Sequence, residues 1–203
     1  MAPFTTAIND LKIRASWGRV GNDAIPAFGY LSTIRNGNSA DNYALGTGDQ
    51  SIVVGSTLVR PGNADLKWET TQQLDIGIDA SFFGDKLYLT ADYYKKDNIG
   101  MLISLPVSLE AGFQNAPSVN GGQVRNTGTE LLIGYRSKVG EFRFNVSANA
   151  TALKNEVITL GVGQPIVGPT LAGSSMTMTY TRVGEPIGYY RGYVVDGIYQ
   201  TNQ

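Results

Sequence analysis

The sequence predicts an all-β fold: about five antiparallel up-and-down strands of a transmembrane β-barrel, joined by long external loops and too few to close the barrel. The composition supports this class. Of 203 residues, 16% are charged and 25 are glycine, whereas an ordinary soluble domain has roughly 25% charged residues and about 7% glycine. Low charge with abundant glycine suits a barrel whose outer face meets lipid and whose interior is polar without being densely charged.

Apolar and polar residues alternate along five runs, which is the pattern of strands with two different faces. The runs cover residues 11–17, 74–82, 87–94, 129–136 and 142–151. The second run can be read from residue 66, which makes it longer than the five or six residues usual in soluble proteins. A strand that crosses a bilayer needs about 9–11 residues.

The connections between these runs are unequal in length. "FGDK" joins the second and third runs and "KVGE" joins the fourth and fifth, each with a glycine where positive φ is needed. The longer links cover about residues 20–65, 99–122 and 156–187. Outer-membrane barrels sort their loops in this way, so we expect the two tight turns to face the periplasm and the long loops to face the exterior.

The alternation also predicts which side each residue faces. The expected lipid-facing residues are Leu74, Ile76, Ile78, Leu131, Ile133, Phe142 and Phe144. The expected lumen-facing residues are Asp75, Asp79, Asp92, Glu130 and Arg143. Tyr93, Tyr94 and Tyr135 lie near the ends of runs, where barrels carry aromatic girdles, although tyrosine is also a good strand former in general.

Several classes of function lack the residues they need. The net charge is −1 with no basic patch, so we expect no nucleic-acid partner. The chain contains no histidine and no cysteine, which removes the commonest metal ligand, the commonest general base and thiolate nucleophiles. "GVGQPIVG" has Ile166 where a dinucleotide fingerprint requires its third glycine, and no helical pattern follows. We therefore expect no enzyme, no cofactor and no metal site.

Two alternatives rest on carboxylates. One is a glycosidase pair, which needs two carboxyl groups about 5–10 Å apart and could come from Asp75, Asp79, Asp92 and Glu130. A polar lumen explains the same four residues more simply. The other is a calcium site with oxygen ligands from Asp41, Asp49, Asp65 and Asn63, whose spacing does not match an EF-hand loop.

The N-terminal residues "MAPFTTAINDLK" lack the charged and apolar regions of a signal peptide. The sequence also has no stretch of 18 or more apolar residues, so it predicts no transmembrane helix. We expect either that the protein is not exported or that its natural N-terminus lies upstream.

Four segments resemble, in order, the SusC/RagA-type TonB-linked outer-membrane transporters. "NADLKWETTQQLDIGIDASFFGDKLYLTADYYKK" resembles a segment in which an "NPDLKWE" run enters a strand and the next strand ends in "DYY" and lysine. "LKIRASWGRVGN" resembles the preceding strand, "GQVRNTGTELLIGY" the "V-x-N-x-G-x-E" strand, and "VGEPIGYYRGYVVDGIYQ" a late external loop. Ala64 departs from the family's proline, and "KKDNIGMLI" lacks the threonine that commonly follows the "DYY" lysines.

This resemblance implies that residues 1–203 are a fragment of the barrel domain, with no plug domain and no TonB-contacting segment. Family barrels have about 22 strands, so five strands are roughly a quarter. The resemblance further implies an outer-membrane location with lipid contact, import of oligosaccharides or peptides energised through TonB, and a SusD-like lipoprotein on the external face. The alternative from another class is a soluble all-β module, lectin- or adhesin-like, that binds a carbohydrate or a protein.

The late external loop holds the expected ligand-binding residues, which are Tyr189, Tyr190, Arg191 and Tyr193. Aromatic residues and arginine are enriched at binding hot spots, and exposed rings can stack on sugars. The simpler alternative is that these rings pack loop against loop.

Overall fold

The computed structural model describes most of the chain apart from its ends and a few short internal stretches. The described residues are 8–37, 41–45, 51–104, 108–161, 163–170, 176–192, 194 and 196–197. The elements are β1 (Ile8–Asn22), β2 (Thr33–Asn36), β3 (Tyr43–Leu45), β4 (Ser51–Val53), β5 (Ser56–Arg60), β6 (Glu69–Phe82), β7 (Leu87–Ser104), the short 3-10 helix η2 (Leu109–Ala111), β8 (Ser118–Val139), β9 (Phe142–Leu160), β10 (Ile166–Val167), β11 (Thr179–Thr181) and β12 (Tyr189–Tyr190).

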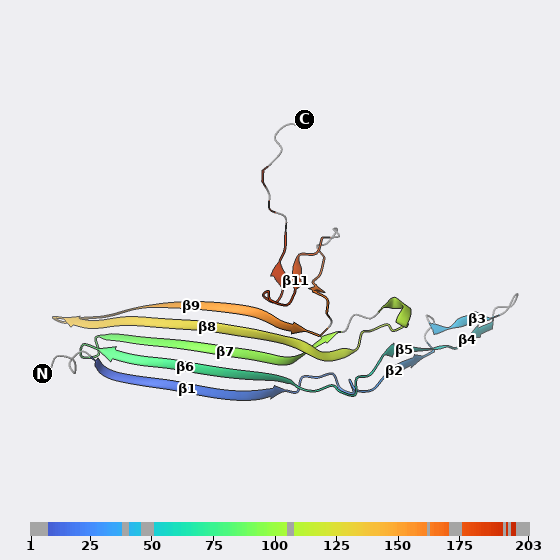
Figure 1. Ribbon diagram of the computed structural model, residues 1–203, viewed down its shortest axis with the longest axis horizontal. Helices are drawn as coiled ribbons and strands as arrows, with labels where there is room; N and C mark the ends of the chain where they lie inside the picture. The colour runs from blue at the N-terminus through green and yellow to red at the C-terminus, as the bar shows by residue number, and fades with distance from the viewer. Residues whose placement is uncertain are drawn as a thin grey trace.

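The five long strands form one antiparallel sheet in the order β1-β6-β7-β8-β9 (Figure 1). This confirms the predicted all-β, antiparallel and open arrangement. Among the described residues, β1 pairs only with β6, and β9 pairs along its length only with β8. None of the helices in the described part of the chain has the length and apolar character to cross a membrane.

The long strands extend further than the sequence predicted. β7 reaches Ser104 and β8 begins at Ser118, so the expected loop 99–122 is wrong at both ends. β9 continues to Leu160, into the expected third loop, while β6 begins at Glu69 rather than at residue 66. The extensions escaped prediction because apolar and polar residues do not alternate strictly in them. In β7, for example, Met101, Leu102 and Ile103 are consecutive apolar residues, and the pairing with β8 shifts beside them.

Both tight turns form where they were predicted. Phe83, Gly84 and Asp85 have φ of 56°, 67° and 62°, so three successive residues adopt the left-handed region. Gly140 has φ of 64° in the β8–β9 turn, and only glycine adopts such a value at no steric cost.

In the central part of the sheet, the register places apolar residues on one face and polar residues on the other. One row across the five strands consists of Ile13, Ile78, Ala91, Leu131 and Ala150. The adjacent row, whose side chains project the opposite way, consists of Arg14, Gly77, Asp92, Glu130 and Thr151. We call these two surfaces the apolar face and the polar face.

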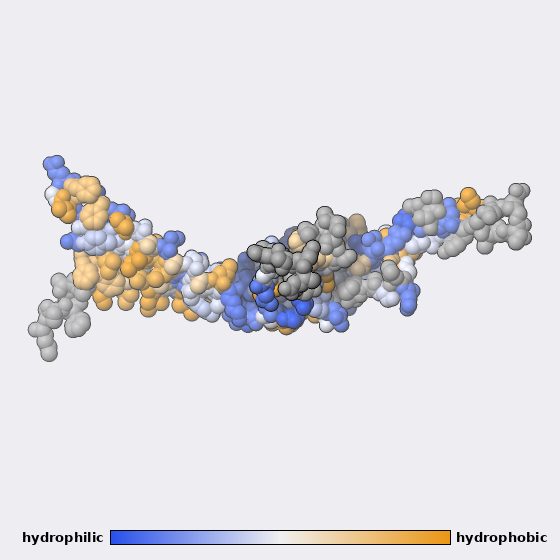
Figure 2. Space-filling model, turned by 90° about the horizontal axis from the view of Figure 1, so that it is seen from above, coloured by the Kyte–Doolittle hydropathy of each residue, from blue (hydrophilic) through white to orange (hydrophobic). Residues whose placement is uncertain are grey.

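The sheet is a single layer with almost no interior. Among the described residues, the buried apolar side chains are Ala80, Val124 and Val157. In contrast, Ile13 and Phe142 on the apolar face are 71% and 69% exposed. Figure 2 shows apolar side chains gathered over the half of the sheet that carries the tight turns. A soluble monomer rarely exposes an apolar surface of this extent, so the face requires a cover.

An arm made of β2–β5 and β3–β4 extends beyond the end of the sheet opposite the tight turns (Figure 1). Arg35 in this arm donates to both carboxylate oxygens of Asp41, at 2.8 and 2.9 Å, and to Gln114 Oε1 at 2.9 Å. The backbone N–H of Asn115 donates to the carbonyl of Val59 at 2.9 Å. The arm is therefore fastened to the β7–β8 connection.

The small sheet β10-β11-β12 stands beyond the β9 edge of the main sheet (Figure 1). The N–H of Val157 donates to the carbonyl of Glu185 at 2.9 Å, and the N–H of Ile187 donates to Asn155 Oδ1 at 2.8 Å. Asn155 in turn donates to Asn126 Oδ1 at 2.7 Å. The small sheet is therefore anchored at the β9 edge, through the backbone of Val157 and through Asn155, whose side chain belongs to the polar face.

The segment before β6 is clamped to its neighbours by two side chains. Asn120 Nδ2 donates to the carbonyls of Lys67 and Gly100 at 2.6 and 2.8 Å, and Asn120 Oδ1 accepts the N–H of Lys67 at 2.8 Å. Glu69 Oε1 accepts the N–H of Leu102 at 2.8 Å. These bonds fix the entry of the chain into β6.

Candidate functional site

A hollow of about 680 Å³ lies in the middle of the polar face. It is lined by Arg14, Ser16, Gln73, Asp75, Asp92, Tyr94, Lys96, Asn126, Glu130 and Leu153. Of the residues expected to face the lumen, Asp75, Asp92 and Glu130 line this hollow. Asp79 lies beside it on the same face, whereas Arg143 lies on that face near the β8–β9 turn, away from the hollow.

Arg14 ties three strands together on this face. Its Nε lies 2.8 Å from Asp79 Oδ2, and its Nη2 donates to Asp79 Oδ1 at 3.2 Å and to Asp92 Oδ1 at 2.9 Å. Thr90 Oγ1 donates to Asp79 Oδ1 at 3.0 Å. Gly77 lies between Arg14 and Asp92 in the register, and a Cβ there would overlap Asp92 Oδ1. Because Arg14 already engages both carboxylates, Asp79 and Asp92 are poor candidates for a glycosidase acid.

The sequence predicts the acidic residues of this hollow but not the basic ones. Arg14 and Lys96 face it too, but only Arg14 lies in a predicted run, and the sequence does not show the strand order that brings both residues beside the acids. Within the described part of the chain, the side chains of Glu130 and Lys96 have no hydrogen-bond or ion-pair partner, so both are available to a bound solute or another segment. The Tyr94 ring lies over Gly128, where any side chain would collide with it.

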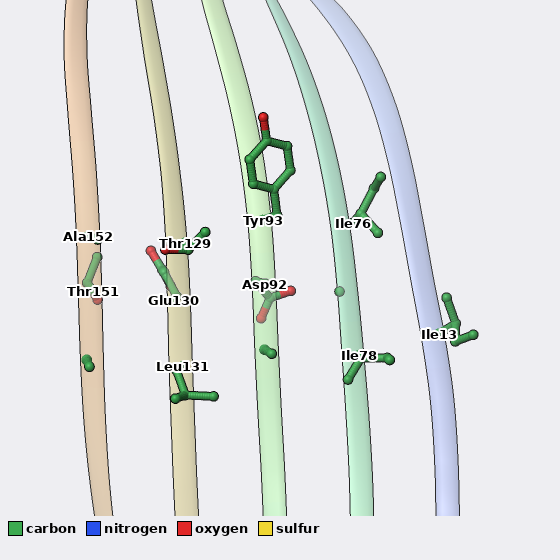
Figure 3. Close-up of a pocket in the computed structure, with 13 residues that line it drawn as sticks. Ile13, Ile76, Ile78, Asp92, Tyr93, Thr129, Glu130, Leu131, Thr151 and Ala152 are labelled. Carbon is green, nitrogen blue, oxygen red and sulfur yellow. The ribbon is translucent and has the colours of Figure 1, made fainter.

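The apolar face carries a second hollow, of about 600 Å³, behind the first (Figure 3). It is lined by Ile13, Ile76, Gly77, Ile78, Ala91, Asp92, Tyr93, Thr129, Glu130, Leu131, Ala150, Thr151 and Ala152. Ala91 gives it depth, because its small side chain stands between the larger Ile78 and Leu131, and the small Ala150 follows on the other side of Leu131. One stretch of sheet thus carries a polar hollow on one side and an apolar hollow on the other.

The expected ligand-binding set is divided by the structure. Tyr189 pairs with Tyr180 across β11 and β12, with ring centroids 6.3 Å apart. The Arg191 guanidinium lies 5.5 Å from the centre of the Tyr180 ring. Tyr190 is 84% exposed, and Tyr193 lies outside the described residues. Tyr189 and Arg191 therefore pack in one cluster with Tyr180, while Tyr190 projects into solvent.

Two residues of the calcium alternative, Asp41 and Asn63, serve other roles in the structure. Asp41 is only 5% exposed, and the hydrogen bond from Arg35 holds the pKa of its carboxyl below the ordinary value. Asn63 donates to a backbone carbonyl of β8 at 2.9 Å, and Asp49 lies outside the described residues. Within the described ranges, no group of three or more His, Cys, Asp or Glu side chains could hold a metal ion.

A profile of the TonB dependent receptor-like, beta-barrel family matches residues 4–203. The chain belongs to this family. The match confirms the predicted resemblance, and the family is one of receptors and transporters rather than of enzymes.

Individual relatives place the chain in the SusC/RagA branch of the family. TonB-dependent receptor P3 of Formosa agariphila is 31% identical over 199 residues, which cover 97% of this chain and 19% of that protein. TonB-dependent receptor SusC of Bacteroides thetaiotaomicron is 27% identical, covering 96% of this chain and 20% of that protein. A solved structure of the RagAB peptide importer in the 'open-open' state has a TM-score of 0.67 at 25% identity, covering 89% of this chain and 18% of the other. The chain spans about a fifth of the length of these curated relatives.

Proposed function

We propose that this chain forms part of the barrel wall of an outer-membrane importer of the SusC/RagA type, which takes up an oligosaccharide or peptide nutrient with energy delivered through TonB. The single observation that carries the proposal is the combination of one apolar face, one polar face and open edges in a single-layer sheet. In a membrane barrel, lipid covers the apolar face, an aqueous or plugged lumen meets the polar face, and neighbouring strands pair with the open edges.

The distribution of apolar residues along the strands supports an orientation in which the tight turns face the periplasm. The long strands of the sheet have 14 to 22 residues, more than the roughly 9–11 that cross a bilayer. Apolar side chains gather near the tight turns (Figure 2), so the remaining length extends beyond the membrane on the side of the long loops. The tight turns then face the periplasm, and the arm and the small sheet β10-β11-β12 lie outside the cell.

The polar face is the proposed route of the solute. Its hollow offers carboxylates, amides, a phenol and two cationic side chains, which suits hydroxyl-rich or amide-rich solutes better than lipids. The small sheet is anchored on the polar side through Asn155, which favours a position above the lumen entrance. We propose that Tyr189, Tyr190, Arg191 and Tyr193 contact the solute or a SusD-like lipoprotein there.

The soluble lectin-like alternative has less support. A soluble module needs a second layer to cover an apolar sheet face. Within the described residues, the small sheet and the arm leave residues such as Ile13 and Phe142 exposed. The proposed lipid cover accounts for this exposure directly.

Fluorescence quenching in the full-length transporter tests which face meets lipid. Single cysteines at Ala148 and Asn149 form a matched pair, because these neighbours in β9 lie on the apolar and polar faces. A fluorophore at position 148 should be quenched by nitroxide-bearing lipids, and one at position 149 by a water-soluble quencher. Equal lipid quenching at both positions would reject the barrel-wall proposal. Uptake is tested by deleting the gene and measuring growth on a panel of glycans and peptides.

A further inference from the structure

On the apolar face, charged residues begin abruptly at the end away from the tight turns. The last mainly apolar row contains Ala15, Ile76, Tyr93, Thr129 and Ala152. The next row with the same orientation contains Trp17, Leu74, Lys95, Thr127 and Lys154, and the one after that contains Arg19, Gln72, Asp97, Arg125 and Glu156. Two neighbouring rows therefore hold four cationic and two anionic side chains. We call Arg19, Lys95, Arg125 and Lys154 the basic belt.

Ion pairs hold most of the basic belt in place. Arg125 Nε lies 2.7 Å from Asp97 Oδ1, and its Nη2 lies 3.3 Å from Asp97 Oδ2. Lys95 Nζ lies 4.0 Å from Asp97 Oδ2, and Lys154 Nζ lies 2.6 Å from Glu156 Oε2. Four positive charges face two negative ones, so the belt keeps a surplus of positive charge on side chains whose positions are already restricted.

The apolar hollow lies directly beside the belt. The row of Tyr93 and Ala152 forms its edge, and Lys95 and Lys154 follow two residues further along the same strands, about 7 Å away. The alanine floor of the hollow, at Ala91, provides an apolar groove of about 600 Å³. Along the strand direction, this surface therefore changes from an apolar groove, nearer the tight turns, to cationic side chains farther from them.

From this arrangement we infer that the apolar face binds one lipid of the outer leaflet whose phosphate-bearing headgroup has a net negative charge, with an acyl chain in the apolar hollow and the anionic headgroup on the basic belt. The inference rests on the proposed function, because it requires this face to meet the membrane. The charge and the apolar groove together favour an anionic lipid, because basic side chains at the membrane boundary attract anionic headgroups. Trp17, which is 64% exposed, lies beside the belt at the level where aromatic girdles occur.

Native mass spectrometry of the full-length transporter in detergent tests the inference. The protein is titrated with phosphatidylglycerol or with phosphatidylcholine of the same acyl chains, and the affinities are compared. The wild type should prefer the anionic lipid. Each basic residue near an anionic lipid contributes about fivefold in affinity, and Asp97 and Glu156 offset part of this. The Lys95→Gln/Lys154→Gln variant should therefore lose roughly tenfold in affinity for phosphatidylglycerol and little for phosphatidylcholine.

Two further variants separate the headgroup from the acyl chain. Lys12→Gln/Lys96→Gln removes the same charge from the polar face and should keep the preference. Ala91→Phe fills the hollow and should weaken both lipids alike. Heat-modifiable gel mobility confirms that each variant is folded. A wild type without preference, a belt variant that keeps it, or a polar-face variant that loses it equally would overturn the inference. If the quenching test at positions 148 and 149 still succeeds, the barrel-wall proposal survives such a result.

Discussion

Leu131 and Leu132 offer the sharpest test of the membrane orientation, because two identical neighbours in β8 point to opposite faces. Their exposures in the described chain are similar, 44% and 37%, so exposed area alone predicts similar effects of substitution. The barrel orientation predicts different effects. Leu131 would meet lipid, whereas Leu132 would face the lumen, where an arginine can remain hydrated.

The depth of Leu131 follows from the register. It lies four residues from Thr127, beside the basic belt, and four from Tyr135 near the tight turns, which is about 13 Å along the strand in each direction. With a strand tilt of about 40° this becomes roughly 10 Å of depth on each side, so Leu131 lies close to the membrane midplane. Arginine there should cost about 2–4 kcal/mol in the free energy of unfolding. Arginine at Ile76, which pairs with Tyr93 farther from the midplane, should cost less free energy of unfolding.

The assay is unfolding by denaturant in lipid vesicles, together with the assembled fraction in outer membranes judged by heat-modifiable mobility. Leu131→Arg should lower the folded-to-unfolded ratio by about 30-fold or more, and Leu132→Arg should change it little. If both variants assemble and unfold like the wild type, or if Leu132→Arg is the worse of the two, the assignment of faces is refuted.

Three further predictions follow from particular contacts. Gly77→Ala should displace Arg14 from Asp92 and lower the thermal unfolding midpoint. The control Gly18→Ala should leave the midpoint unchanged, because its added Cβ would have no atom within 4 Å. An unchanged midpoint for Gly77→Ala would contradict the close approach of Asp92 and Arg14 to Gly77. The Arg35 hydrogen bond lowers the pKa of Asp41 below its ordinary value of 3.8. The ion pair should therefore stabilise the arm above about pH 4 and lose that effect as the pH falls through the lowered pKa. Hydrogen exchange of the arm should rise in that pH range in the wild type and be less pH-sensitive in Asp41→Asn. An epitope tag at Gly112 should be labelled on intact cells and one at Asp85 should not, and the reverse pattern would invert the topology.

The sheet could be predicted from the sequence because its central part has a strict division of faces. Along β6, Leu74, Ile76 and Ile78 alternate with Asp75 and Asp79, and the register confirms that these sets lie on opposite faces. A one-residue error in register would have exchanged the two faces. The alternation therefore predicts both the position of the strand and the face of the sheet on which each of its side chains lies.

The rest could not be predicted because it depends on contacts that leave no periodic signal. The order β1-β6 places Arg14 beside Asp79, although 65 residues separate them. The short strands of the arm and of β10-β11-β12 have two to five residues, too few for a repeating pattern. The role of Gly77 also appears only in three dimensions, because its φ is ordinary and the requirement for glycine comes from two side chains on neighbouring strands.

The "LKWE" segment shows how one motif can serve strand entry and loop placement together. At Gly100, with φ of 68°, a bulge in β7 shifts the pairing with β8. Glu69 Oε1 accepts the N–H of Leu102 just beyond this bulge. An unsatisfied N–H in a restricted position is costly, so Glu69 stabilises the bulge, while Asn120 bonds both backbone groups of Lys67. The motif thus fixes where the chain enters β6, beside the bulge in β7.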